Sequence, residues 1–282
     1  MMAALALLAV ALTVGAQTPA NADPQLYVAL GDSYAAGPLI PLQEEPWGCL
    51  KSTNNYAKLL ASRLGAELRD ATCSGADTND MTTSQGVFPE ANPPQFDRLD
   101  AGVDLVTLQI GGNDIGFGGI AETCARAAFE QESCREQYVT PDGRDELRER
   151  IAATGPEVAA VIQGIHQRSP GASVYVLGYS GIFRIATPAD PTASCPAMLV
   201  GEEDAHYLRG VQEALNAMIA EQAAANGATY VDVYGPSAGK TACDLPVVRW
   251  LEPIVPANAA APIHPNLMGM LGVTEVIDAA IP

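Results

Sequence analysis

The stretch Leu26-Tyr27-Val28-Ala29-Leu30-Gly31-Asp32-Ser33 decides the fold of this chain. Its first five residues form an apolar run of strand length, and a loop begins at the Gly-Asp-Ser that follows. A strand that ends in this way delivers a serine hydroxyl to the edge of a sheet. A serine alone is a poor nucleophile, so a chemical role for Ser33 requires a base and oxyanion donors from elsewhere in the chain.

Further strands and helices are predicted downstream of this stretch. Short runs of strand length lie at 67–71, 105–110, 174–177 and 230–233. Helical periodicity is seen at 54–64, 147–165, 208–219 and 266–281, although Gly155-Pro156 should break or kink the second of these helices.

Strands and helices thus alternate along the chain, with short connections. This order favours βαβ units and hence a flavodoxin-like three-layer α/β/α sandwich around a parallel five-stranded sheet. Ligands of such sheets bind beyond the carboxyl ends of the strands. Ser33, Gly75 and Asn113 follow the first three predicted strands, so the pattern brings them to one edge.

The N-terminus has the features of an export signal. An apolar stretch at 3–16 is followed by Ala20-Asn21-Ala22, a site of the kind that signal peptidase cleaves, although no Lys or Arg precedes the stretch. The stretch is shorter than the roughly 20 residues that span a bilayer. We therefore expect a signal peptide at 1–22, one domain at 23–282, a secreted product, and no stable membrane insertion after the signal is removed.

The charge balance limits the partners. With 33 acidic and 15 basic residues the net charge is −18, which argues against binding to nucleic acid and against electrostatic attraction to anionic membranes. We expect a monomer that needs no cofactor.

Six cysteines suit an exported protein with disulfides. Their spacing leaves all 15 pairings open, and the absence of a Cys-x-x-Cys pair disfavours a metal site. The cysteines are Cys49, Cys73, Cys124, Cys134, Cys195 and Cys243.

Four short segments, in order, carry a family resemblance. They are Gly31-Asp32-Ser33, Cys73-Ser74-Gly75, Ile110-Gly111-Gly112-Asn113-Asp114 and His264-Pro265-Asn266. Together they resemble the SGNH (GDSL) hydrolase family and its secreted actinobacterial lipases and esterases, from about Leu26 to the C-terminus.

The resemblance implies a role for each matching residue. Ser33 would be the nucleophile and His264 the general base, while the Ser33 amide, Gly75 and Asn113 would form the oxyanion hole. Each such donor is worth about 100- to 1,000-fold in rate. The chemistry fits the residue types, because Asn113 offers a side-chain amide and Gly75 lacks a Cβ that would keep a substrate away.

The chain departs from the usual family pattern in one place. An aspartate often precedes the histidine by three residues, and that position holds Ala261. Some secreted members use a Ser–His dyad in which a backbone carbonyl orients the imidazole, so we expect the Ala261 carbonyl to accept the Nδ1 proton of His264. Similar members pair cysteines in order, which implies Cys49–Cys73, Cys124–Cys134 and Cys195–Cys243.

Other candidates fit less well. His166 and His206 lie on stretches with helical periodicity, where surface positions explain them. Gly178-Tyr179-Ser180-Gly181-Ile182 approaches the G-x-S-x-G elbow of α/β-hydrolases but fails at Ile182, and prolines follow where a helix should begin.

The sequence therefore predicts a secreted ester hydrolase that works through an acyl-enzyme, with a lipase or short-chain esterase as the first hypothesis. A carbohydrate acetyl esterase is the alternative within the enzymes. A catalytically silent carbohydrate-binding protein on the same fold is the alternative outside them.

Overall fold

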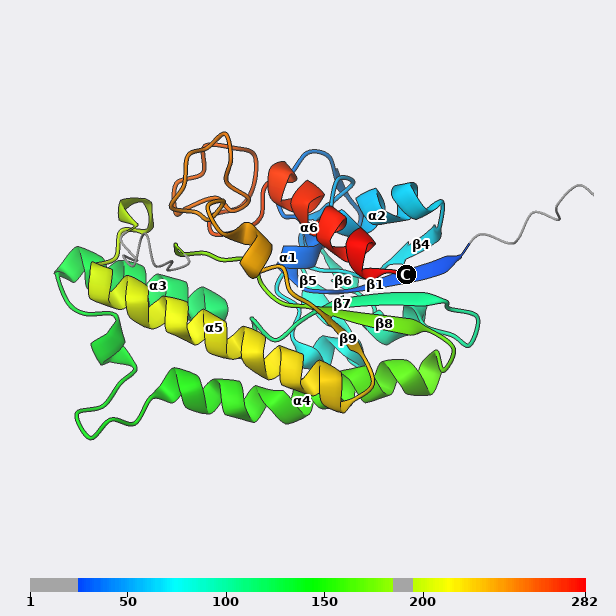
Figure 1. Cartoon of the computed structure of the whole chain (residues 1–282), viewed down its shortest axis with the longest axis horizontal. Helices are drawn as coiled ribbons and strands as arrows, with labels where there is room; N and C mark the ends of the chain where they lie inside the picture. Colours follow the sequence, from blue (N-terminus) through cyan, green and yellow to red (C-terminus); the bar gives the residue numbers. More distant parts are fainter. Residues whose placement is uncertain (1–24, 185–194) are drawn as a thin grey trace, which may run out of the picture.

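A parallel sheet organises the molecule (Figure 1). This computed structural model describes residues 25–184 and 195–282, so the predicted signal peptide at 1–22 lies outside the described residues. The five strands have the order β4-β1-β7-β8-β9, and all neighbours run parallel, which confirms the predicted fold class. The strands are β1 (Leu26–Gly31), β4 (Glu67–Asp70), β7 (Leu105–Gln109), β8 (Ser173–Leu177) and β9 (Thr229–Val231).

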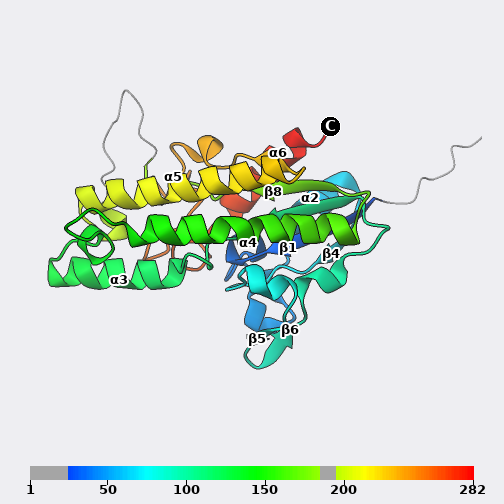
Figure 2. The ribbon, with the colours of Figure 1, turned by 90° about the horizontal axis from the view of Figure 1, so that it is seen from below.

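Helices cover both faces of this sheet (Figures 1 and 2). Alternate side chains of β1 enter two separate cores: Val28 and Leu30 pack on one face, Tyr27 and Ala29 on the other. The first core is closed by α3 (Phe117–Glu130), α4 (Glu146–Arg168) and α5 (Glu202–Ala225), and the second by α2 (Tyr56–Leu64) and α6 (Leu267–Ala280). The alternation follows from the two-residue period of a strand.

Local sequence sets several helix ends. Asn55 begins α2 by accepting a hydrogen bond from the Lys58 amide, and Gly65 ends this helix in the left-handed conformation. Asn266 caps α6 in the same way, accepting from the Gly269 amide. This cap lies two residues after His264, so the start of α6 helps to hold that histidine.

Two features of the helices differ from the expectation. Helix α4 continues through Gly155-Pro156 without a break. Pro156 has no N–H to donate to the Ala152 carbonyl. Ala152 and Pro156 are both exposed, so water can take the place of the missing donor. Helix α3 was not predicted, because Gly118 and Gly119 in its first turn weaken the helical signal.

Short elements occupy the loops. Helix α1 (Ser33–Ala36) directly follows β1, and two small antiparallel sheets pair β2 (Gln43–Glu44) with β3 (Lys51–Ser52) and β5 (Gln85–Val87) with β6 (Glu90–Asn92). Turns of 3₁₀ helix occur at Trp47–Cys49, Thr78–Met81, Gln95–Arg98, Arg135–Gln137, Pro196–Met198 and Gly235–Ser237.

The structure contains three disulfides, and they join the pairs that the resemblance implies: Cys49–Cys73, Cys124–Cys134 and Cys195–Cys243. In the described residues, no helix has both the length and the apolar character of a membrane span.

Candidate active site

Ser33 begins α1 at the carboxyl end of β1, where the chain turns sharply. Gly31 has a φ of +151°, and a Cβ there would lie 2.6 Å from the Gln109 carbonyl oxygen of β7, so this position requires glycine. The buried Gln95 side chain bonds both the amide (2.8 Å) and the carbonyl (3.0 Å) of Gly31. The end of β1, and with it Ser33, is therefore held in place from two sides.

His264 comes from the far end of the chain to meet Ser33. Its Nε2 lies 2.7 Å from the Ser33 Oγ, and its Nδ1 lies 2.7 Å from the Pro262 carbonyl oxygen. Because a carbonyl only accepts, Nδ1 carries the proton, and Nε2 is free to accept the hydrogen of the Ser33 hydroxyl. The geometry is that of a serine beside its base.

The predicted orienting carbonyl was wrong by one residue. The Ala261 carbonyl accepts the backbone N–H of His264 (3.2 Å), and the Pro262 carbonyl takes the imidazole proton. The reason is a turn at Ile263, whose φ of +59° lies in the left-handed region that β-branched residues rarely adopt. The Tyr34 hydroxyl donates to the Ile263 carbonyl (2.8 Å) and helps to hold this strained turn.

Aromatic rings enclose the imidazole. The centroid of the Tyr34 ring lies 5.2 Å from that of His264, and the Phe117 ring stands edge-on at 6.2 Å. Burial lowers the pKa of His264 below its usual value of 6.5, while the hydrogen bond to Pro262 acts in the opposite direction. The imidazole is therefore neutral near pH 7, as a general base must be.

A buried network behind Ser33 links the three loops that follow β1, β7 and β8. The Tyr179 hydroxyl donates to the Asp32 carboxylate (2.5 Å) and accepts from the Gly112 amide (2.8 Å), and Asp32 also accepts from the Tyr34 amide (2.9 Å). Burial raises the pKa of Asp32 to about 7, although the bonds from Tyr179 and Tyr34 lower it. Sequence analysis missed this role of Tyr179, which lies after β8 and meets Asp32 only in the folded chain.

The predicted oxyanion donors lie on the two loops next to Ser33. Asn113 lines the same pocket as Ser33, and one N–H of its amide donates to the Ala76 carbonyl (2.8 Å), which leaves the second N–H for a ligand. Asp114 beside it accepts from the amide and the hydroxyl of Thr78, which ties this loop to the Gly75 loop.

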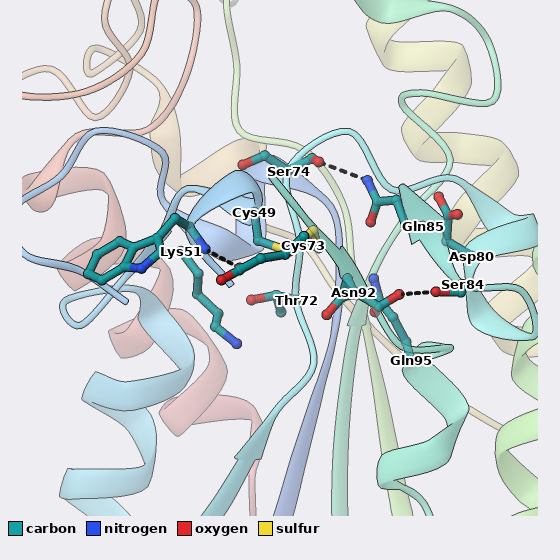
Figure 3. The surroundings of a disulfide bond; sticks show 12 residues. Cys49, Lys51, Thr72, Cys73, Ser74, Asp80, Ser84, Gln85, Asn92 and Gln95 are labelled. Atoms are coloured by element: carbon teal, nitrogen blue, oxygen red, sulfur yellow. Dashed lines mark hydrogen bonds between the residues drawn. A yellow bond between two sulfur atoms is a disulfide. The ribbon is translucent and has the colours of Figure 1, made fainter. Parts of the chain in front are cut away.

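Gly75 lies on an exposed turn with a φ of +82°. The turn is anchored by the Cys49–Cys73 disulfide and by Gln85, whose Nε2 donates to the Ser74 carbonyl at 2.9 Å (Figure 3). The role of Gly75 and Asn113 as oxyanion donors stays a prediction.

The loop that carries His264 is braced by a buried ion pair. Arg249 bonds both carboxylate oxygens of Glu252, and Glu252 also accepts from Asn258 and Asn266. The Glu252 amide in turn donates to the His264 carbonyl (3.0 Å). Burial alone would raise the pKa of Glu252, but the bonds from Arg249, Asn266 and Asn258 outweigh it and lower the pKa to about 2.

An apolar pocket starts at Ser33. Its empty space, part of which is open solvent, measures about 860 Å³ and lies between α3 and α5. Its lining beyond Ser33 and Asn113 is dominated by aliphatic and aromatic side chains, among them Ile115, Phe117, Ile120, Ile182, Phe183, Met198, Val200, Leu208, Val211, Leu215, Ile254 and Ile263. The sequence assigned no such pocket, because its walls come from segments far apart in the chain.

The rival candidates lie elsewhere. Ser180 is buried, and its carbonyl accepts from Gln212. His166 is half-buried on α4, and His206 on α5 contacts Arg209. In the part of the chain that the structure describes, no cluster of His, Cys, Asp and Glu could hold a metal ion.

Comparison with known proteins gives a family and close relatives. The GDSL-like Lipase/Acylhydrolase family matches residues 29–270. Lipase 2 of Streptomyces coelicolor is 40% identical over 259 residues, which cover 89% of this chain and 84% of that protein. A lipase of Streptomyces rimosus is 30% identical over 259 residues, which cover 90% of this chain and 86% of that one.

Solved structures of two Streptomyces enzymes have a fold similar to that of this chain. A phospholipase A1 from Streptomyces albidoflavus superposes with a TM-score of 0.71 at 25% identity, and the extracellular lipase from Streptomyces rimosus with 0.70 at 28% identity. Each match covers 91% of this chain and 99% of the other.

Proposed function

Because this chain belongs to the GDSL-like lipase/acylhydrolase family, whose members are carboxylic ester hydrolases, we propose that it cleaves lipid esters through an acyl-enzyme formed on Ser33. The observation that carries the proposal is one juxtaposition. The Ser33 Oγ lies 2.7 Å from the His264 Nε2, at the mouth of an apolar pocket that extends between α3 and α5.

The first half of the reaction acylates the serine. The Ser33 Oγ attacks the ester carbonyl while the His264 Nε2 takes its proton, and the Nδ1 proton stays on the imidazole, hydrogen-bonded to the Pro262 carbonyl. The Ser33 amide, the Gly75 amide and the free N–H of Asn113 would bind the oxyanion. When the tetrahedral intermediate collapses, the imidazolium returns its proton to the leaving alcohol.

The second half repeats these steps with water. The His264 Nε2 removes a proton from water, the resulting hydroxide attacks the acyl carbonyl, and the acid leaves as Ser33 regains its hydrogen. The neutral Pro262 carbonyl fixes the tautomer of His264 as a carboxylate would, without adding a charge beside the imidazolium.

The pocket supports a lipid over an acetylated carbohydrate as substrate. An acetyl group needs only a small space beside Ser33, whereas apolar side chains from α3 and α5 also line this pocket, which suits an acyl chain. The relatives named lipase and phospholipase A1 point the same way.

The cellular compartment and the oligomeric state of the protein form part of the proposal. Three disulfides and the extracellular relative from Streptomyces rimosus support secretion after removal of 1–22. We propose that residues 23–282 form a single domain that works as a monomer, without a cofactor and without binding nucleic acid.

Hydrolysis of p-nitrophenyl acetate, butyrate, octanoate and palmitate tests the proposal. Wild type should prefer chains longer than acetate, and Ser33→Ala should lose activity on all of them. Val211→Phe narrows the pocket and should shift the preference to shorter chains while activity on acetate remains. Glu221→Phe, an exposed position on the same helix, is the control.

An enzyme confined to acetyl esters would favour the carbohydrate acetyl esterase instead. Absence of hydrolysis on every ester would favour the silent binding protein.

A further inference from the structure

Residues 245–263, called the apolar loop from here on, have an unusual composition for this chain. Arg249 and Glu252 are the only charged residues in these nineteen positions, although the chain as a whole carries a net charge of −18. Both are buried, with exposed fractions of 5% and 0%, and they pair with each other. The surface of the apolar loop is therefore uncharged.

The remaining polar side chain of the apolar loop, Asn258, is exposed, but it is hydrogen-bonded within the loop. The Asn258 amide donates to the Glu252 carboxylate (2.7 Å) and to the Pro246 carbonyl (3.0 Å), and its backbone N–H donates to Glu252 (3.1 Å). Trp250 is buried beneath Lys240. The polar side chains thus brace the loop from within.

Several large apolar side chains of this loop are exposed. Leu245, Val247 and Val255 are 70%, 79% and 76% exposed, and Val248 is 45% exposed. Four exposed apolar side chains within eleven positions of one loop are typical of a surface that another phase or molecule covers.

The apolar loop adjoins the active site directly. Ile254 and Ile263 line the pocket that begins at Ser33, and His264 follows the loop in sequence. Figure 1 shows this segment in orange, projecting from the body of the molecule beside the start of α6. Whatever covers the loop therefore lies next to the mouth of the pocket.

We propose that the apolar loop seats the enzyme on an uncharged or zwitterionic lipid–water interface, so that an acyl chain passes from the lipid layer into the pocket along Ile254 and Ile263. This inference rests on the proposed lipase function. The charge of −18 disfavours an anionic layer, and an uncharged loop offers no salt bridges to one.

Vesicle binding tests the loop separately from catalysis. All proteins carry Ser33→Ala, so the lipid stays intact, and cosedimentation with phosphatidylcholine vesicles gives the partition constant. The triple variant Leu245→Ser/Val247→Ser/Val255→Ser should bind about tenfold more weakly or worse, because it removes apolar area that the lipid would bury. Phosphatidylglycerol vesicles should bind the parent protein less than phosphatidylcholine vesicles do.

Phe88→Ser provides a matched control. Phe88 is 94% exposed at the tip of the β5–β6 hairpin, which projects on the side of the molecule away from α6 (Figure 2). This variant should bind phosphatidylcholine within about twofold of its parent. Equal loss in both variants, or no loss in the triple variant, would overturn the assignment of the loop. A dimer on gel filtration that the triple variant converts to a monomer would make a second copy the occupant and would also overturn it.

Activity separates this inference from the proposed function. With Ser33 present, the triple variant should hydrolyse dissolved p-nitrophenyl butyrate within about twofold of wild type, which also shows that it folds, and should be about tenfold slower on emulsified long-chain esters. If wild type cleaves long-chain esters and the triple variant matches it on the emulsion, the loop inference fails alone. If wild type cleaves no long-chain ester, the proposed lipase function fails.

Discussion

At the scale of single residues, the reactivity that we propose for Ser33 depends on which nitrogen of His264 carries a proton. The Pro262 carbonyl holds the proton on Nδ1, so the lone pair of Nε2 faces the Ser33 hydroxyl. The arrangement needs no third acidic residue, only a turn at Ile263 that presents a carbonyl to the ring. A backbone carbonyl stays in place when the side chain of its residue is changed. A substitution of Pro262 is therefore a weaker test of this arrangement than a change in pH.

The pH dependence of hydrolysis should follow His264. Only the neutral imidazole accepts a proton, and burial lowers the pKa of His264 below 6.5. Activity should therefore rise with pH through a midpoint below 6.5 and be nearly constant above it. The measurement is kcat/KM on p-nitrophenyl butyrate from about pH 4 to 8.

Asp32 is the competing titratable group, because its pKa is about 7. Asp32→Asn should keep the acid limb of the profile where it was, since His264 remains the base. A midpoint near 7 in wild type that disappears in Asp32→Asn would contradict the assignment.

Tyr179→Phe should show what the buried network contributes. The change leaves the Asp32 carboxylate and the Gly112 amide each without the partner they share, at a cost of about 1–3 kcal/mol in the free energy of unfolding. Because Gly112 precedes Asn113, we also expect kcat to fall while KM changes little. Urea unfolding and steady-state kinetics measure both, and an unchanged kcat in a destabilised variant would reduce Tyr179 to a packing role.

Short motifs allowed the pairing of Ser33 with His264 to be predicted, because each residue lies in a distinctive local sequence at an element boundary. The carbonyl that orients His264 was predicted one residue too early. An isoleucine does not indicate a left-handed turn, because β-branched residues rarely adopt that conformation, so the turn at Ile263 could not be predicted. The partnership of Tyr179 with Asp32 joins two loops 147 positions apart, and no local pattern encodes it.

At the scale of elements, the position of His264 depends on the brace formed by Arg249 and Glu252. Glu252→Ala leaves Arg249 as an unpaired buried charge, which should cost about 3–5 kcal/mol in the free energy of unfolding. The pKa of Glu252 is lowered to about 2, so its stabilising contribution is present above about pH 4.5 and is lost as the pH falls toward 2.

Urea unfolding of Glu252→Ala at about pH 7 measures this loss, with Glu221→Ala as an exposed control on α5. We also expect lower activity in the folded fraction, because Glu252 bonds the His264 carbonyl through its amide and Asn266 through its carboxylate. Stability equal to that of the control would show that the pair does not brace the loop.

Hydrophobic periodicity allowed most elements to be predicted, and its failures have local causes. Even the polar strand β4 was identified, although Glu67, Arg69 and Asp70 break the apolar pattern of an edge strand. Helix α3 was missed because two glycines hide its start. Helix α4 was expected to break at Pro156, yet packing against α5 stabilises it across the proline.

At the scale of the whole molecule, one disulfide joins two loops beside the candidate active site. The Cys49–Cys73 bond closes a loop of 24 positions and anchors the turn that carries Gly75 (Figure 3). The chain-entropy model gives such a bond a contribution of about 3 kcal/mol. Cys49→Ser/Cys73→Ser should therefore lower the free energy of unfolding by about this amount, and kcat on p-nitrophenyl acetate should also fall if Gly75 is an oxyanion donor.

Cys124→Ser/Cys134→Ser is the comparison, because its disulfide closes a loop at α3 instead of the Gly75 turn. That variant should lose stability and keep its kcat on acetate, a substrate that does not reach the α3 side of the pocket. An equal fall of kcat in both double variants would mean that the Gly75 turn has no special role.

The global fold was predictable because strands and helices alternate along the whole chain. The pocket was not predictable. Its walls come from α3, α5 and the loops after β8 and before His264, and only packing brings them together. Likewise, the surface of the apolar loop is uncharged because Arg249 and Glu252 are buried, and their burial could not be predicted from the local sequence.

Labelling with an octyl fluorophosphonate tests the central claim most directly. An activated serine displaces fluoride from phosphorus, and the adduct is located by peptide mass spectrometry. The account predicts one adduct, on Ser33 in wild type, and at least about a hundredfold slower labelling in His264→Ala, which lacks the base. Labelling of another serine such as Ser180, or equal labelling of Ser33 without His264, would contradict it.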